Sequence, residues 1–280
     1  MSLDRLDNVT DKIVICIPVA LKSRKAIAYA LADKYGMNYL FAGGIFQDTI
    51  AKEYCLIDIR DRQQADNVNN VNNVNNVNVV NTQPRDLIDS FNLLGKDKIS
   101  EEILGQIKNY RQAVYLISRD VGYEACVTLA RFTQIFLSIG GIAVMVDSTG
   151  VVHSKDRWLA NYNSQDVFDI YSLFVTLIAG EDRYYSCGMN NFGKADVSID
   201  IGEDTGLAIY VMNVFNYYRL TESVIIKDGQ TFQPDIECPM YKIQWCEYRE
   251  DELDNSLNDS NGRWHLSRLG NDLEIGYRVS

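Results

Sequence analysis

The sequence predicts an α+β fold made of two ferredoxin-like halves of β-α-β-β-α-β type with antiparallel sheets, followed by a C-terminal β extension. Apolar stretches of strand length alternate with stretches of helix length, and the first six follow the order of a ferredoxin-like module. The 280 residues, 46% of them hydrophobic, suffice to bury a core. We therefore expect one compact domain at 12–236, with halves at about 12–118 and 119–236, and an extension at 237–280.

The first half opens with a near-continuous apolar stretch at 12–19, which is typical of a strand covered on both faces. Ser23 is placed to cap a helix over 24–35 that Gly36 ends, and Ser100 is placed to cap a later helix. Gly43-Gly44 interrupts the second strand and predicts a bulge. The other elements expected here are strands at 39–46, 54–59 and 113–118 and a helical stretch at 85–110.

The second half shows the same alternation of strand-length and helix-length apolar stretches. Ser154 can cap a short helix that runs through Leu159, and Asp204 can cap a long aromatic helix. Asp228-Gly229 is a strong hairpin signal. The other elements expected after residue 118 are helices at 123–139, 167–178 and 207–220 and strands at 142–146, 151–153, 183–189, 197–201, 223–226, 230–232, 241–248, 263–266 and 273–279.

Residues 67–78 are four copies of Asn-Val-Asn, a period that fits neither a strand nor a helix. Asparagine favours turns and local side-chain hydrogen bonds. We expect residues 62–84 to be a low-complexity insertion in a surface loop. The alternative is an aggregation-prone or partner-binding tract.

Composition excludes several classes of function. The net charge of −11 disfavours nucleic-acid binding, because no basic stripe compensates for it. It indicates either simple solubility or a docking surface for a basic partner. The first residues do not read as a secretory signal, and no apolar stretch approaches the ~20 residues that span a bilayer. Six scattered cysteines without C-x-x-C spacing predict free thiols in a cytoplasmic protein.

Three segments carry a resemblance to a known family: Gly150 to Ser154, Cys187 to Val197, and Asp228 to Thr231. In this order they resemble a bacterial family catalogued as domain of unknown function 4261. Ala195 stands where that family often has proline, and Gln230 where it often has aspartate. The resemblance covers roughly residues 12–235. It implies the architecture and brings no established activity.

His153 is the best single candidate for chemistry, since it lies at a strand end before a helix cap. It could serve as the base for a nucleophile such as Cys187, or work beside the carboxylate of Asp196. The competing interpretation is that His153 bonds a nearby backbone group and orders the turn. With two histidines and no zinc-ligand spacing, we expect no metal site, and no motif calls for a cofactor.

The segment 187–200 supplies the candidate binding residues. Gly188, Gly193 and Lys194 echo a phosphate-binding loop, but Ala195 replaces its Ser or Thr and a strand pattern follows instead of a helix. We therefore predict a turn between two strands, with Phe192 anchored in the core. The candidate binding residues are Gly188, Asn190, Asn191, Gly193 and Asp228.

The leading hypothesis is a non-catalytic binding protein that docks a basic protein partner, as a toxin-neutralising immunity protein does. One alternative is an enzyme of unassigned class that uses His153 with Cys187 or carboxylates. The other is a small-metabolite sensor, which rests on fold analogy. The sequence leaves the oligomeric state open.

Overall fold

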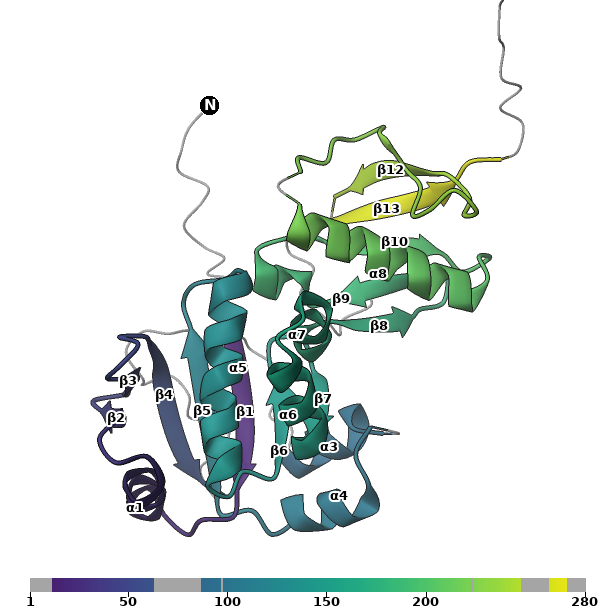
Figure 1. Cartoon of the computed structure of the whole chain (residues 1–280). Coiled ribbons are helices and arrows are strands. Elements are labelled where there is room, and N and C mark those ends of the chain that lie inside the picture. The colour runs from purple at the N-terminus through teal and green to yellow at the C-terminus, as the bar shows by residue number, and fades with distance from the viewer. Residues whose placement is uncertain (1–11, 63–86, 97, 223, 248–261, 271–280) are drawn as a thin grey trace, which may run out of the picture. The chain divides into compact units, whose positions relative to one another are not determined.

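The computed structural model describes residues 12–62, 87–96, 98–222, 224–247 and 262–270. The chain divides into two compact units, Met1–Phe174 and Val175–Ser280 (Figure 1). Each unit has a β-sheet of its own, so the fold is of the α+β class. Among the described residues, no helix combines the length and apolar character that crossing a bilayer needs.

The first unit is built on a seven-stranded sheet of order β2-β3-β4-β5-β1-β6-β7, in which all neighbouring strands are antiparallel. The apolar stretch at 12–19 forms the inner strand β1, as its near-continuous apolar residues predicted. The strands are β1 (Ile13–Val19), β2 (Tyr39–Ala42), β3 (Ile45–Asp48), β4 (Tyr54–Asp61), β5 (Gln112–Ser118), β6 (Ala143–Val146) and β7 (Val151–Ser154).

Helices cover both faces of this sheet. The apolar helix α5 packs on the face that carries Ile15 and Phe46, where the Phe46 ring meets those of Phe132 and Phe136. Two shorter helices, α3 and α4, pack on the opposite face around Cys16. The helices of this unit are α1 (Arg24–Tyr35), α3 (Leu87–Leu94), α4 (Glu101–Ile107), α5 (Tyr123–Ser138), α6 (Lys155–Ser164) and α7 (Val167–Phe174).

The second unit is a six-stranded sheet of order β11-β12-β13-β10-β9-β8. One face is covered by α8 (Thr205–Thr221), whose apolar side packs on Val197, Ile243 and Leu266. A 3-10 turn, η2 (Met189–Phe192), joins β9 and β10. The strands are β8 (Thr176–Ala179), β9 (Arg183–Cys187), β10 (Asp196–Asp200), β11 (Thr231–Phe232), β12 (Tyr241–Cys246) and β13 (Arg263–Arg268).

The division of the chain differs from the expected halves at 12–118 and 119–236. β6 pairs with β1, which places residues 143–146 in the first sheet. β12 and β13 are inner strands of the second sheet, so residues 241–246 and 263–268 of the expected extension belong to this sheet and are not an appendage to it. The second sheet is also not wholly antiparallel, because β13 runs parallel to β10. Its order of three strands, one long helix and three strands is not β-α-β-β-α-β.

Some predicted elements need correction. The strand expected at 39–46 is a hairpin of β2 and β3, because Gly43 and Gly44 both have positive φ and form a tight turn instead of a bulge. The helix expected at 167–178 ends at Phe174, and the β-branched stretch after it pairs with β9 as β8. The expected strand at 223–226 is irregular from 224 to 226.

The predicted helix N-caps are confirmed. The side chains of Ser23, Ser100, Ser154 and Asp204 each accept a hydrogen bond from the amide three residues ahead, as predicted for N-caps. The insertion at 62–84, apart from its first residue, and the strand expected at 273–279 lie outside the described residues.

Candidate functional site

The segment 187–200 is organised by one buried carboxylate. Asp196, at the start of β10, is 7% exposed. It accepts a hydrogen bond from the Ser186 hydroxyl at 2.7 Å and from the backbone amides of Gly188 at 3.2 Å and Met189 at 3.1 Å. The Ser186 hydroxyl in turn accepts from the amide of Val197 at 3.0 Å. Asp196 therefore holds the turn between β9 and β10 and presents no open carboxylate to a substrate.

The candidate binding residues of this turn have structural roles. Gly188 has φ 125° and Gly193 has φ 67°, conformations that favour glycine at both ends of η2. Asn190 accepts from the amide of Asn191, which is itself buried. The prediction of a turn between two strands is confirmed, and Phe192 is buried as expected.

The remaining candidate, Asp228, lies in a different loop of the second unit. Its carboxylate accepts from the amide of Trp245 at 2.7 Å, which ties the turn before β11 to β12. It is exposed at the surface, and this hydrogen bond joins it to the backbone of its own unit. Asp228 thus orders the turn before β11, but the hairpin predicted at Asp228-Gly229 does not form, because residues 224–226 are irregular and β11 pairs with β12.

His153 lies within β7 and is 2% exposed. Its Nε2 is 2.9 Å from the carbonyl oxygen of Leu173, and its ring meets that of Trp158 edge-on at 5.6 Å. A carbonyl oxygen only accepts, so Nε2 carries the hydrogen. Within the described part of the chain, the buried Nδ1 has no hydrogen-bond partner. Burial, with the nearby charge of Arg157, lowers the pKa of His153 to about 4.

These facts bear on the enzyme hypothesis. His153 belongs to the first unit, whereas Cys187 and Asp196 belong to the second. Both Cys187 and His153 are buried, and His153 is neutral at physiological pH. None of the six cysteines takes part in a disulfide, as expected, and four of them are buried. The burial of His153 favours the interpretation that it orders the chain around it.

A second histidine, which the sequence reasoning set aside, lies in a serine–histidine–aspartate chain. The Ser198 hydroxyl on β10 is 3.1 Å from Nδ1 of His265 on β13, and Nε2 of that ring is 3.4 Å from an Asp200 carboxylate oxygen. The order of groups is that of a hydrolytic triad, but Ser198 is fully buried and no substrate carbonyl can approach it. Burial lowers the pKa of His265, and the Asp200 carboxylate does not restore it. These contacts with Ser198 and Asp200 fix the orientation of the His265 ring.

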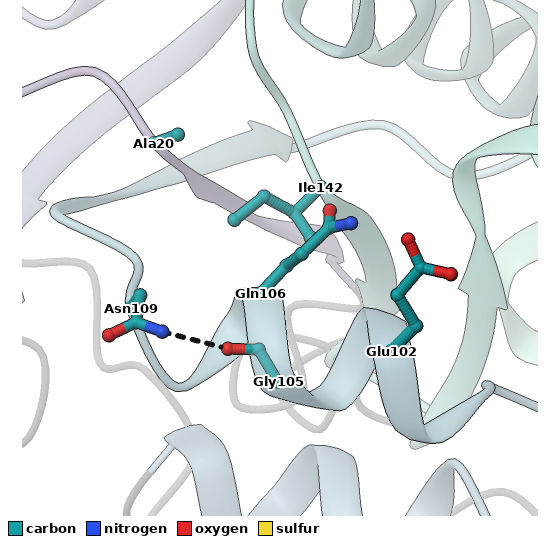
Figure 2. A pocket seen from close by; sticks show the side chains of 6 residues that line it. All are labelled: Ala20, Glu102, Gly105, Gln106, Asn109 and Ile142. Atoms are coloured by element: carbon teal, nitrogen blue, oxygen red, sulfur yellow. Dashed lines mark hydrogen bonds between the residues drawn. The ribbon is translucent and has the colours of Figure 1, made fainter.

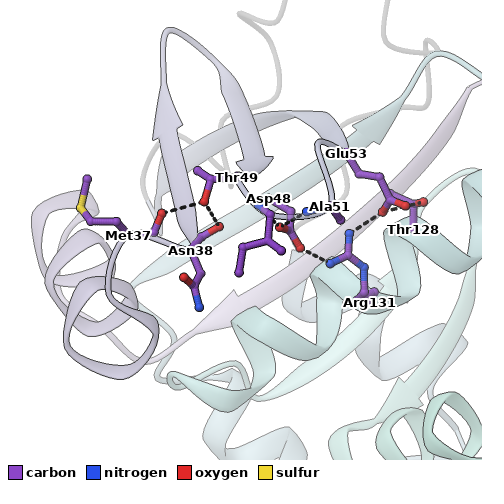
Figure 3. Close-up of polar contacts among 9 residues, drawn as sticks. Met37, Asn38, Asp48, Thr49, Ala51, Glu53, Thr128 and Arg131 are labelled. Carbon is purple, nitrogen blue, oxygen red and sulfur yellow. Dashed lines mark hydrogen bonds and ion pairs between the residues drawn. The ribbon is translucent and has the colours of Figure 1, made fainter.

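The most connected ion pairs lie in the first unit, where Arg131 of α5 reaches the turn between β3 and β4 (Figure 3). Its guanidinium bonds the carboxylates of Asp48 and Glu53. Asp48 is 5% exposed and also accepts from the amides of Ile50 and Ala51 at 2.8 Å. Burial alone would raise the pKa of Asp48, but the amide and guanidinium hydrogen bonds lower it. The cluster locks a hairpin onto a helix.

Cavities offer little for a large ligand. A shallow depression of about 350 Å³ lies beside α4 in the first unit and is shown in Figure 2. None of the predicted site residues lines it, and its Asn109 amide is turned back onto the carbonyl of Gly105. Within the described residues, no group of three or more His, Cys, Asp or Glu side chains could hold a metal ion. The lining residues are Ala20, Glu102, Gly105, Gln106, Asn109 and Ile142.

The outer side of α8 is the most unusual surface of the described chain. Four large apolar or aromatic residues on it, which we call the tyrosine face, are 37–44% exposed: Ile209, Tyr210, Tyr217 and Tyr218. The single charged residue of α8, Arg219, is buried. A helix without charge on its outer side is typical of one that is covered on both sides.

Comparisons of the chain with protein-family models, with curated proteins and with solved structures found no match. The resemblance to family 4261 therefore stays a prediction. Function has to be argued from the geometry of the two units.

Proposed function

We propose that the protein is a non-catalytic binding protein whose tyrosine face docks a basic protein partner. The observation that carries the proposal is the uncharged, exposed outer side of α8 in a strongly acidic unit. Tyrosine is enriched at the centre of protein interfaces, because its ring supplies contact area and its hydroxyl a hydrogen bond.

The charge of the chain supports a basic partner. Residues 175–280 hold 18 Asp and Glu against 9 Lys and Arg, a net of −9, whereas residues 1–174 are nearly balanced at −2. Two exposed carboxylates lie beside the first half of α8: Asp204 caps the helix, and Asp235 accepts a hydrogen bond from the Tyr210 hydroxyl at 2.9 Å. An acidic rim around an apolar centre steers a basic partner and then buries apolar area.

The geometry supports the enzyme alternative less well. A general base must reach the proton it abstracts, and His153 is enclosed with its pKa near 4. Asp196 is engaged by three donors, two of them backbone amides. A binding protein that docks its partner at the tyrosine face does not require His153 or Asp196 to be accessible.

We also infer that the first unit is an elaborated ferredoxin-like module. β1 and β4 run parallel with β5 between them, and β5 and β6 run parallel with β1 between them. Split pairs of parallel strands of this kind support a ferredoxin-like core to which β2, β3 and β7 are additions. The absence of a disulfide among the six cysteines, all of which lie in the described residues, supports a cytoplasmic location.

The docking proposal is tested by selecting a phage-displayed random peptide library against the whole protein. We expect selected peptides to be rich in Lys and Arg and to combine them with apolar residues. A double variant, Tyr210→Ser with Tyr217→Ser, should weaken their binding at least about 30-fold, since each interface tyrosine contributes roughly 1–2 kcal/mol. The control is Tyr29→Ser with Tyr54→Ser, two exposed tyrosines of the first unit, which should leave affinity unchanged.

Four outcomes would overturn the proposal. The first is selection of neutral or acidic peptides, and the second is binding that ignores the double variant. The third is concentration-dependent self-association that the double variant abolishes, which assigns the face to a second copy. The fourth is protection of the amides of α8's outer side by another part of the same chain, seen as exchange that speeds up when that part is removed.

A further inference from the structure

A second feature of the same unit lies just before β10, within the segment 187–200, and includes none of the four residues of the tyrosine face. It is a hollow of about 150 Å³ whose walls come from four places in the chain. Part of the wall is the stretch before β10, part is the last turn of α8, part follows that helix, and part is β13. The lining residues are Lys194, Ala195, Arg219, Val224, Ile226 and Trp264.

Two cations share this hollow. Arg219 is 4% exposed; its guanidinium donates to the carbonyl of Ala195 at 2.9 Å and to the side chain of Asn216, and it lies over the Phe215 ring. Lys194 is partly exposed, and in the described part of the chain no carboxylate lies within ion-pair distance of its ammonium. Burial lowers the pKa of Lys194, and the positive charge of Arg219 lowers it further.

A purely structural role accounts for only one of these two charges. Arg219 ties the end of α8 to the strand entry at Ala195, so its burial has a reason in the fold. Lys194 makes no such tie, and its proximity to Arg219 costs free energy in the folded state. In a unit with twice as many acidic as basic residues, a lysine that faces a second cation across a small hollow points to an anion that the described residues do not supply to it.

We propose that this hollow binds a small aliphatic carboxylate, with the carboxylate between Lys194 and Arg219 and the alkyl chain against Val224, Ile226 and Trp264. The volume matches about six non-hydrogen atoms, since a protein cavity of about 150 Å³ takes up benzene. A partly apolar wall favours a hydrocarbon tail over a compact inorganic anion. This site gives the small-metabolite hypothesis a location, and it does not depend on docking at the tyrosine face.

The test is a titration of the whole protein with butyrate, butyramide and inorganic phosphate, followed by ¹H–¹⁵N NMR. Butyrate should bind saturably and shift the amides of residues 194–195 and 224–226. Butyramide, which has the same shape without the charge, should bind at least about tenfold more weakly, and phosphate should also bind more weakly because it lacks the tail.

Lys194→Gln should weaken butyrate binding at least about fivefold and leave the fold intact, because the described residues give its ammonium no ion pair to lose and glutamine keeps part of its side-chain length. Lys242→Gln, an exposed lysine of β12 outside the hollow, is the matched control and should change nothing. Equal binding of butyramide, tighter binding of phosphate, unchanged affinity in Lys194→Gln, or no saturable binding of butyrate would each overturn the proposal.

Discussion

At the scale of single residues, the buried polar side chains of this protein hold backbone. Asp196 gathers two amides and a hydroxyl, and His153 donates to the carbonyl of Leu173. Each of these groups loses water on folding and regains hydrogen bonds from the chain, which is the condition for burying them. The polar atoms of these residues are therefore occupied by hydrogen bonds that stabilise the fold.

The first prediction concerns the pH dependence that His153 causes. Its pKa is about 4 in the folded chain and about 6.5 when unfolded, so the unfolded state binds more protons between these values. The stability it contributes is complete above pH 6.5 and is lost as the pH falls toward 4, by about 3 kcal/mol in all. His153→Gln keeps a donor for Leu173 without titrating. Urea unfolding of both proteins from pH 4 to 7 should therefore show a difference that changes with pH. A constant difference would contradict this account.

The second prediction concerns Asp196. Asp196→Asn replaces a carboxylate oxygen with an amide that repels at least one of the N–H groups it faces. We expect a loss of about 2–3 kcal/mol in the free energy of unfolding. Asp200→Asn on the same strand is the control and should cost less than about 1 kcal/mol, because its side chain is 67% exposed. Equal effects of the two substitutions would show that Asp196 does not organise the turn.

At the scale of elements, contacts between side chains and turns set how helices meet strands. Arg131 joins the middle of α5 to the turn after β3, and the Thr49 hydroxyl, 3.0 Å from the carbonyl of Met37, joins that turn to the chain before β2 (Figure 3). The strands β2 and β3 form the outer end of the first sheet. An edge hairpin has few neighbours, so such anchors carry a large share of its stability.

The third prediction tests this anchor. Arg131→Met leaves Asp48 buried without its cation and should cost about 2–4 kcal/mol in urea unfolding. Adding Asp48→Asn to that variant should recover part of the loss, because no uncompensated charge then remains. Losses that simply add would mean that the two side chains do not act on each other.

At the scale of the whole molecule, the chain has two sheets with separate buried clusters and an uneven charge. One cluster lies between α3, α4 and the first sheet, and another lies between α8 and the second sheet. Nearly all of the net charge falls after residue 174. The acidic unit is therefore the one that a basic partner encounters first.

The fourth prediction follows from the separate clusters. Phe215→Ala removes a fully buried ring from the second unit and should cost about 3–5 kcal/mol there. Hydrogen exchange should accelerate for amides of β10 and β13, while those of β1 and β5 keep their protection. Equal acceleration in both sheets would instead show that the two units unfold as one.

Local sequence signals predict much of the local structure of this protein. Helix caps at Ser23, Ser154 and Asp204 were predictable because a cap bonds an amide three residues away. The turn at 188–193 was predictable for the same reason, since its glycines meet a local backbone requirement. The acidic balance is likewise a property of composition.

Contacts between residues that are distant in sequence depend on the packing of the whole chain. Ser198 and His265 come together because β13 lies parallel to β10, a pairing of segments 67 residues apart that no local pattern encodes. Burial of His153 and exposure of Tyr210 on an apolar helix also depend on packing between distant elements. Strand order and burial depend on which segments of the chain bury their apolar faces against one another. The strand order of the two sheets and the hollow beside Lys194 therefore could not be predicted from local sequence patterns.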